Sequence, residues 1–362
     1  MGQYKVVVYA ICKNEEKFVR RWIASMQEAD AIYVTDTGSD DNTVQLLEEN
    51  GAIVNKIHLN PWRFDEARNL SLSFVPEDTD ICVCTDLDEV FDAGWREELE
   101  KVWIKGKTTR ARYNYIWSFN EDGTPGVNFW IEKIHTRSDF KWVHPVHEVL
   151  AYSGSAPDCY ATADHICLKH YPDQTKPRSQ YLPLLELSVK ECPEDDRNVH
   201  YLGREYMYYK QYDKCIETLK RHLNLKTAVW PDERAASMRY IARSYQAKGD
   251  LYNASVWLYR AIAEAPYLRE GYTEMALLAY REENWAKVYH MCEEALKITS
   301  RPKSYINEAF CWDSTIYDLG AVSAYHLGMM ETSEELAKKA LALSPENERL
   351  RKNLEIIESK IK

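Results

Sequence analysis

The sequence predicts two domains of different class, an α/β domain followed by an all-α domain built from repeats. Three observations support this prediction. Apolar, β-branched segments alternate with amphipathic helical segments between residues 4 and 85. One apolar strand ends in a carboxylate cluster, Asp86-Leu87-Asp88-Glu89. Beyond residue 197, small residues recur with a period of about 34, which is typical of paired helices.

The first domain is expected to begin with a buried parallel strand over residues 4–11, because its side chains are apolar and mostly β-branched. The further expected elements are a helix over 15–28, a strand over 31–35, a helix over 43–50, a strand over 52–58, a helix over 66–75 and a strand over 80–85. Repeated strand–helix units form a parallel sheet with helices on both faces. Residues 108–172 are aromatic and strand-like instead, with glycine and proline between the runs.

Polar clusters near Asn14, Asp36 and Asp86 each follow a predicted strand. The carboxyl ends of parallel strands meet at one edge of the sheet, where ligands of such folds bind. Three carboxylates at the tip of a buried strand are electrostatically costly unless a cation or its ligands sit beside them. Carboxylates of this kind hold hard divalent metals, which often bind substrate phosphates as well. The alternative for an isolated acidic pair is a solvated turn.

The second domain carries small residues in register. The paired positions of successive first helices are Leu202-Gly203, Ile241-Ala242, Met275-Ala276 and Gly320-Ala321; Cys215, Ala254, Val288 and Ser333 follow in the second helices, and Ala261, Ala295 and Ala340 come seven residues after the last three. Insertions are expected near 224–231 and 299–311. The pattern resembles the tetratricopeptide repeat, two antiparallel helices per unit, whose stacked pairs commonly bind peptides or proteins. A generic helical bundle is the alternative.

The first domain resembles a family-2 glycosyltransferase of the GT-A fold. The matching segments, in order, are Ala10-Ile11-Cys12-Lys13-Asn14-Glu15-Glu16, Asp36-Thr37-Gly38-Ser39 with Asp41-Asn42-Thr43, Ala67-Arg68-Asn69 and Asp86-Leu87-Asp88-Glu89. The resemblance covers roughly residues 4–172 and extends to the subgroup that carries tetratricopeptide repeats. It implies a glycosyltransferase domain over 1–172, a helical linker over 173–196 and a repeat domain over 197–362.

The resemblance also implies a nucleotide-sugar donor, UDP-hexose by preference, and a Mn²⁺ or Mg²⁺ ion. The metal would be held by Asp88 and by His170, which precedes the helical half, with His165 as the less favoured alternative to His170. The residues expected to line the nucleotide are Ala10, Glu15, Asp36, Arg68, Asp86 and Leu87. Where the family often has a second acid after Asp36, this chain has Thr37. Arg68 is expected to contact phosphate or base, with an ion pair to Asp65 or Glu66 as the alternative.

A catalytic base is expected in the segment around Pro145. Glu148 resembles the acidic position of the family, and His147 is the alternative. A carboxylate there takes the proton of an acceptor hydroxyl as it attacks the anomeric carbon, which inverts the configuration. Trp117, Trp130 and Trp142 lie in the same aromatic region, and one of them is expected to line the site.

Composition narrows the classes of partner. The net charge of -11 argues against a large nucleic-acid footprint. No apolar window approaches the roughly 18 residues that a membrane span needs, and the apolar start is expected to be a strand rather than a signal peptide. Nine cysteines, odd in number and scattered, suit a reduced cytoplasmic protein.

Two readings compete with an active transferase. In one, the repeats form an interaction scaffold and the first domain is inactive. In the other, the sheet belongs to a nucleotidyltransferase, but those usually carry a glycine-rich phosphate loop after the first strand, and residues 12–16 contain no glycine. For the active enzyme, the repeats are expected to hold a peptide or protein acceptor or to mediate homodimerisation.

Overall fold

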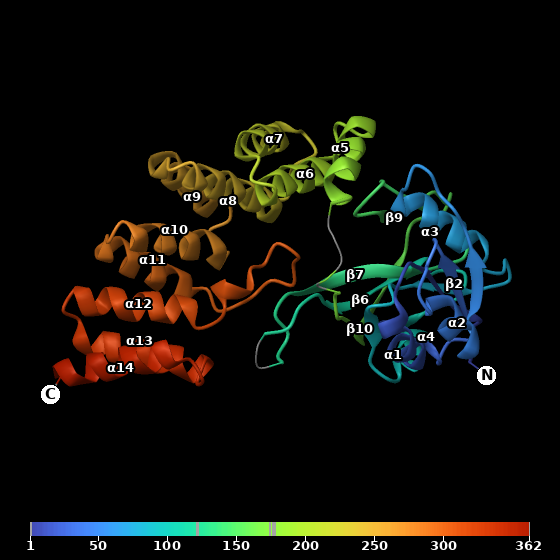
Figure 1. The fold of residues 1–362 in the computed structure, drawn as a ribbon, viewed down its shortest axis with the longest axis horizontal. Helices are drawn as coiled ribbons and strands as arrows, with labels where there is room; N and C mark the ends of the chain where they lie inside the picture. The colour runs from blue at the N-terminus through green and yellow to red at the C-terminus, as the bar shows by residue number, and fades with distance from the viewer. Residues whose placement is uncertain (1, 121–122, 174, 176–178, 362) are drawn as a thin grey trace. The chain divides into compact units, whose positions relative to one another are not determined.

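The computed structural model describes residues 2–120, 123–173, 175 and 179–361. The chain divides into two compact units (Figure 1). The first consists of Met1–Ser188 with Lys303–Tyr305, and the second of Val189–Pro302 with Ile306–Lys362.

The first unit is built on an eight-stranded mixed sheet with the order β3-β2-β1-β4-β7-β6-β10-β5. The strands are β1 (Val6–Cys12), β2 (Ala31–Asp36), β3 (Ile53–Lys56), β4 (Ile81–Cys84), β5 (Glu89–Phe91), β6 (Arg110–Ile116), β7 (Asn128–His135) and β10 (Tyr160–His170). β1 is parallel to β2 and β4, and β2 is parallel to β3. β7 is antiparallel to both of its neighbours. β8 (Phe140–Val143) and β9 (Val149–Tyr152) form a separate hairpin sheet.

Helices cover both faces of the sheet, and β1 shows why. Its side chains alternate, so that Val6, Val8 and Ala10 belong to one core while Val7 and Tyr9 belong to another. The first core includes side chains of α1 (Glu16–Met26), α2 (Thr43–Glu49) and α4 (Trp95–Val102). The second includes α3 (Phe64–Ser73) and the β8–β9 hairpin. A strand buried on both faces explains the unbroken apolar run of β1.

The predicted alternation of strands and helices is confirmed as far as β4. The parallel pairing is interrupted there, because the aromatic segment inserts β7 antiparallel between β4 and β6. It resumes between β6 and β10, which are parallel to each other. β5 and α4 were not predicted. β5 is three residues long, and α4 buries only Trp95 and Leu99, so neither carries enough apolar positions for a periodic signal.

The second unit is a stack of helix pairs (Figure 1). The helices are α6 (Asp196–Tyr208) with α7 (Tyr212–Asn224), α8 (Pro231–Ala247) with α9 (Leu251–Glu264), α10 (Arg269–Arg281) with α11 (Trp285–Lys297), and α12 (Thr315–His326) with α13 (Met330–Leu343). A 3-10 turn η1 (Ala309–Cys311) lies before α12, and α14 (Glu348–Ile361) ends the stack. α5 (Tyr181–Glu191) precedes α6 along the chain, and its residues up to Ser188 belong to the first unit.

The small residues that predicted the repeats lie where the helices pack. Ala242, Ala276 and Ala321 are buried, and a Cβ on Gly203 would lie 2.3 Å from Leu219 Cδ2. Cys215, Ala254, Val288 and Ser333, in the second helices, are fully buried. The predicted all-α repeat architecture is confirmed.

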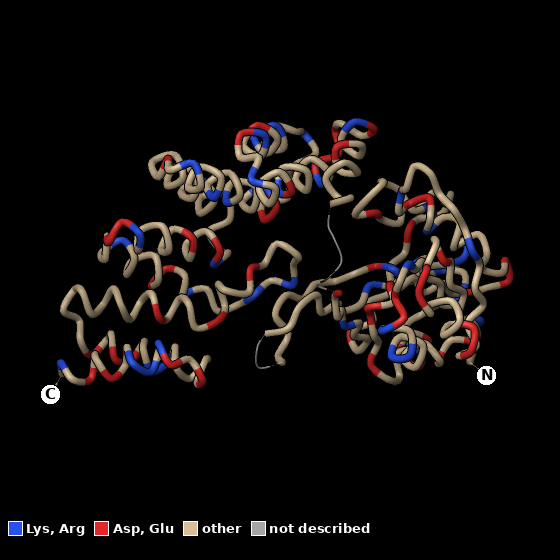
Figure 2. Tube along the Cα trace, in the orientation of Figure 1, with Lys and Arg blue, Asp and Glu red and all other residues tan. Residues whose placement is uncertain are grey.

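Acidic and basic residues interleave along the repeat helices (Figure 2). Many of them pair within a helix or with the next one, as Lys338 does with Glu334 at 2.6 Å and Lys248 with Asp213. None of the described helices combines the length and apolarity that crossing a bilayer requires.

One side chain fastens α3 to the β8–β9 hairpin. Asn69 Nδ2 donates to the Trp142 carbonyl at 2.8 Å, and the Trp142 N–H donates to Asn69 Oδ1 at 2.9 Å. We predict that Asn69→Ala lowers the free energy of opening of this hairpin by about 1–3 kcal/mol, because two backbone groups lose their partners. Amide exchange of residues 140–152 should accelerate, and exchange equal to wild type would contradict the prediction. Asn50→Ala, which removes one exposed hydrogen bond, is the matched control.

Candidate functional site

The polar segments that follow β1, β2 and β4 meet at one edge of the sheet. Cys12 is aligned with Asp36 across β1 and β2, and Tyr9 with Cys84 across β1 and β4. Because these strands are parallel, their carboxyl ends deliver the three segments to the same side.

The first two segments are tied to each other by hydrogen bonds. The Asn14 N–H donates to Ser39 Oγ at 2.9 Å, and the Asp40 N–H donates to Asn14 Oδ1 at 2.9 Å. The Glu15 N–H donates to Thr43 Oγ1 at 2.7 Å. Asn14 adopts φ of 55°, a left-handed conformation that asparagine tolerates better than most residues. The two motifs therefore form one loop platform.

Asp36 stabilises the loop platform through hydrogen bonds to its backbone. Its carboxylate, on a residue only 3% exposed, accepts the N–H groups of Gly38 at 3.1 Å and Ser39 at 3.1 Å. This is the local turn role that aspartate commonly takes after a strand. The other β1 candidate, Ala10, is buried, and its carbonyl accepts the Ser71 hydroxyl at 3.0 Å.

Arg68 lies at the centre of the site. Its Nη2 donates to Asp86 Oδ1 at 2.8 Å, its Nη1 lies 3.3 Å from Cys84 Sγ, and its Nε donates to Glu148 Oε1. The guanidinium side chain is only 6% exposed. Burial opposes its charge, but the two carboxylates outweigh burial and raise the pKa of Arg68 well above its usual value.

Asp65 and Glu66, the alternative partners expected for Arg68, pair with Arg63 instead. Arg63 Nη2 pairs with Asp65 at 2.8 Å, and Arg63 Nε lies 3.6 Å from Glu66. Arg68, one turn further along α3, points from the helix toward β4 and the segment before β9 instead. Arg68 therefore does not form a surface ion pair with Asp65 or Glu66.

A second cation, Lys133 of β7, closes the network from the other side. Its Nζ donates to Asp86 Oδ2 at 3.0 Å and to Glu89 Oε1 at 3.0 Å, and Tyr115 donates its hydroxyl to Glu89 at 2.8 Å. Burial raises the pKa of Asp86, but Arg68 and Lys133 outweigh it and hold that pKa well below its usual range. For Glu89 burial prevails and its pKa is raised. Both oxygens of Asp86 are thus committed to protein cations.

Asp88 pairs with a different residue, His170 at the end of β10. His170 Nε2 lies 3.3 Å from Asp88 Oδ2, and Nδ1 lies 3.1 Å from the Trp117 carbonyl. The Trp117 ring stacks on the imidazole with centroids 4.3 Å apart. Burial alone would lower the pKa of His170, but the hydrogen bond and charge of Asp88 outweigh it and raise that pKa.

This pair fits a divalent ion. An Nδ1–H donated to the Trp117 carbonyl turns Nε2 toward Asp88, and such a backbone hydrogen bond commonly orients a metal-binding histidine. A carboxylate oxygen and an imidazole nitrogen suit Mn²⁺ and also leave coordination positions for phosphate oxygens. The two residues predicted as metal ligands, 82 positions apart (170 − 88), therefore lie side by side.

The remaining predicted residues surround the same network. Leu87 is 1% exposed and packs into the core beneath the acidic turn. Glu148 is paired with Arg68, and the adjacent His147 adopts φ of 52° with its ring centroid 5.8 Å from that of Tyr181. Glu15 follows β1 on the loop platform.

The three tryptophans differ in exposure. Trp142 is buried, donates its indole N–H to the Tyr9 hydroxyl at 2.8 Å and lies under Arg68. Trp130 contacts Arg112, with the guanidinium 5.6 Å from the ring centroid. Trp117, stacked on His170, is 48% exposed and is the one that offers a face to solvent beside the acidic turn.

Lys133 and Tyr115 complete the site in ways that the sequence did not predict. Lys133 lies 47 positions from Asp86 along the chain, and Tyr115 lies 26 from Glu89. Alternation along β7 and β6 could have placed them on a face of the sheet, but not against a particular carboxylate, because strand order is not written in local pattern.

Comparison with known proteins separates the two halves of the chain. The model of the family described as Glycosyl transferase family 2 matches residues 7–152. No curated protein matches the chain.

Similar solved structures cover about half of the chain. The crystal structure of MamA has 19% identity over 48% of this chain and 96% of MamA, with a TM-score of 0.38. Pseudomonas aeruginosa pilF has 12% identity over 49% of this chain and 72% of its own, with a TM-score of 0.38. YrrB, described as a TPR protein with an unusual peptide-binding site, has 10% identity over 47% and 80%, with a TM-score of 0.36.

The family match includes Asp36 of β2, Arg68 of α3, and Asp86 and Asp88 of the turn after β4. The helix pairs that follow it along the chain keep the repeat register. The chain thus carries a glycosyl transferase family 2 domain, followed by tetratricopeptide repeats.

Proposed function

We propose that the protein is a metal-dependent, inverting glycosyltransferase that moves a sugar from a nucleotide donor to an acceptor hydroxyl. The observation that carries the proposal is the meeting of Asp86, Asp88, Arg68 and His170 at the carboxyl edge of a family-2 domain. Carboxylate and cationic side chains alternate there within hydrogen-bonding distance of one another. This arrangement suits a ligand that consists of a metal ion and a diphosphate.

Asp88 and His170 are the proposed ligands of Mn²⁺ or Mg²⁺. Such an ion, when bound, supplies charge neutralisation for the departing diphosphate. Asp86, whose oxygens are held by Arg68 and Lys133, is proposed to face the donor ribose. Asp36 and Glu15, on the loop platform, are proposed to lie along the nucleotide, with Ala10 and Leu87 packed beneath it.

Glu148 is the proposed catalytic base. Its pairing with Arg68 fixes the carboxylate in position. We propose that donor phosphate competes for Arg68 and so frees Glu148 when both substrates are present, after which Glu148 accepts the proton of the acceptor hydroxyl. His147, its neighbour, is the alternative base. Trp117 offers an aromatic face on which a sugar ring can stack.

A UDP-hexose is the proposed donor, because UDP sugars are the commonest donors of this family. A peptide or protein is the proposed acceptor, because stacked helix pairs commonly bind such ligands. Cytoplasmic location and homodimerisation through the repeats are further parts of the proposal.

The donor can be tested by thermal stability. UDP-glucose and UDP-N-acetylglucosamine, each with Mn²⁺, should raise the melting temperature of the wild-type protein, because a ligand at 100 times its Kd adds about 2.7 kcal/mol to the free energy of unfolding. Addition of a chelator should abolish the shift. If neither sugar nucleotide nor UDP itself shifts the transition, a UDP donor is wrong.

Asp88→Ala should leave the fold intact and reduce donor hydrolysis and transfer about 100-fold or more, because charge developing on the diphosphate loses its counter-ion. Asp92→Ala, which removes a half-exposed carboxylate paired with Lys169, is the matched control and should retain activity. Turnover of Asp88→Ala at the wild-type rate, measured as UDP release, would refute the proposed metal role.

Glu148→Gln should retain donor binding but slow transfer about 100- to 10,000-fold, the usual range for loss of general-base catalysis. His147→Gln, changed at the neighbouring position, should retain most of the transfer rate. The opposite ranking of the two variants would assign the base to His147, and two unimpaired variants would place it elsewhere.

A further inference from the structure

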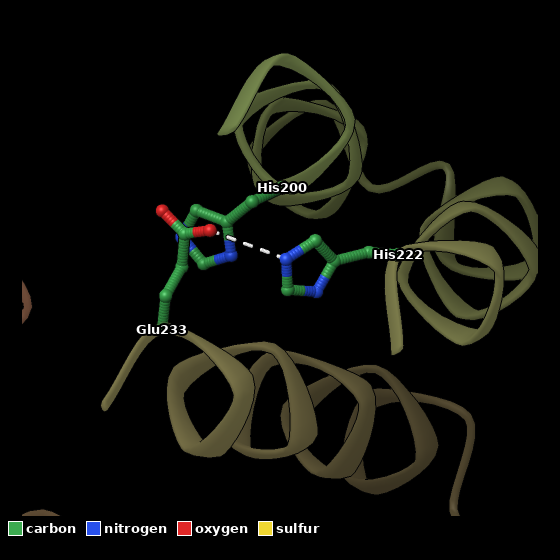
Figure 3. Close-up of side chains that lie close together, drawn as sticks. All are labelled: His200, His222 and Glu233. Atoms are coloured by element: carbon green, nitrogen blue, oxygen red, sulfur yellow. Dashed lines mark hydrogen bonds and ion pairs between the residues drawn. The ribbon is translucent and has the colours of Figure 1, made fainter. Parts of the chain in front are cut away.

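A second cluster of titratable side chains lies inside the repeat domain (Figure 3). It consists of His200 from α6, His222 from α7 and Glu233 from α8. All three are buried, with exposed fractions of 1%, 0% and 3%. Their donor atoms lie within 4.8 Å of one another.

Both imidazoles are held by one hydroxyl group. Ser237 Oγ lies 2.7 Å from His200 Nδ1 and 3.0 Å from His222 Nδ1. A hydroxyl oxygen has two lone pairs, so it can accept an N–H from each ring. In that state both Nε2 atoms carry free lone pairs on the side of the rings away from Ser237. The arrangement is the one in which an outer hydrogen bond fixes the tautomer of a metal-binding histidine.

The carboxylate of Glu233 completes the cluster. His222 Nε2 is 3.2 Å from Glu233 Oε1. His200 Nε2 is buried and has no hydrogen-bond partner among the described residues. Figure 3 shows both rings and the carboxylate gathered at the junction of the three helices. A buried polar atom without a partner is energetically unfavourable, and a ligand at this position would supply the missing partner.

The cluster also coincides with a departure from the repeat pattern. His222 stands seven residues after Cys215, at the position where the later repeats have Ala261, Ala295 and Ala340. Those alanines are at most 2% exposed, because the helices approach closely there. The first repeat thus replaces a small packing residue with an imidazole and places a second imidazole and a carboxylate against it.

The His200 ring lies in buried surroundings that disfavour its charged form. Burial lowers the pKa of His200 to about 3, Glu233 opposes the effect, and His222, Arg204 and Arg239 add to it. Arg239 carries its own counter-ion, Glu274, at 2.6 Å.

We propose that His200, His222 and Glu233 bind a zinc ion that joins α6, α7 and α8. Two imidazole nitrogens and one carboxylate oxygen form a donor set that zinc takes, whereas Mg²⁺ and Ca²⁺ prefer oxygen alone. Ser237 positions both rings, and a water molecule supplies the fourth ligand. The ion locks the first repeat onto the second and so stabilises the end of the stack at which the repeats begin.

The test uses the full chain with Asp88→Asn, so that binding at the sheet edge does not contribute. After treatment with a chelator and its removal, this protein should bind one equivalent of Zn²⁺ or Co²⁺, show the visible absorption of four-coordinate Co²⁺ and melt at a higher temperature with zinc. Adding His222→Gln should weaken zinc binding at least tenfold and abolish the shift. His290→Gln, at an exposed histidine of α11, should change neither.

Circular dichroism with chelator present checks that His222→Gln folds, and Glu233→Gln, nearly equal in shape, provides a second variant if it does not. Zinc content is measured by mass spectrometry after gel filtration. No stoichiometric zinc in the parent, or equal affinity in the parent and in the folded variants, would overturn the proposal.

Discussion

The buried guanidinium of Arg68 is the interaction on which the site depends. It joins three segments, because α3 carries the arginine, the turn after β4 carries Asp86 and the segment before β9 carries Glu148. A buried charge that loses one partner costs about 3–5 kcal/mol, so the three segments are held to one geometry. Lys133 holds β7 to the same turn in a similar way, because its ammonium group pairs with Asp86. With both oxygens of Asp86 occupied by these cations, Asp88 is left to face His170.

The polar residues at the carboxyl ends of the parallel strands could be predicted from the sequence. The residues that β7 and the β8–β9 hairpin bring to this edge could not. Asp36, Asp86 and Asp88 each follow an apolar strand, and parallel strands bring such ends together, so local pattern sufficed. Lys133 and the contact between Arg68 and Glu148 depend on where β7 and the β8–β9 hairpin dock. That docking is fixed by packing and strand order, which no local periodicity encodes.

The repeats were predictable because the same packing problem recurs in each unit. Wherever two helices approach, a small residue is needed, and Gly203, Ala242 and Ala276 meet that need. A regular pattern also makes its exceptions visible. His222 breaks the alanine column once, in the first repeat, and its neighbours in space are the groups that give the exception a chemical meaning. Periodicity therefore predicts architecture, and departures from it indicate sites.

The proposed chemistry at the sheet edge requires Asp88 and His170 to hold a divalent ion together against a nucleotide diphosphate. The most direct measurement is anomalous X-ray diffraction at the manganese edge from crystals of the full chain grown with Mn²⁺ and UDP. If these two residues are the ligands, a manganese peak is expected about 2.0–2.3 Å from an oxygen of Asp88 and from His170 Nε2, next to the UDP phosphates. Ordered UDP at the sheet edge with manganese bound elsewhere, or with no manganese peak, would contradict it.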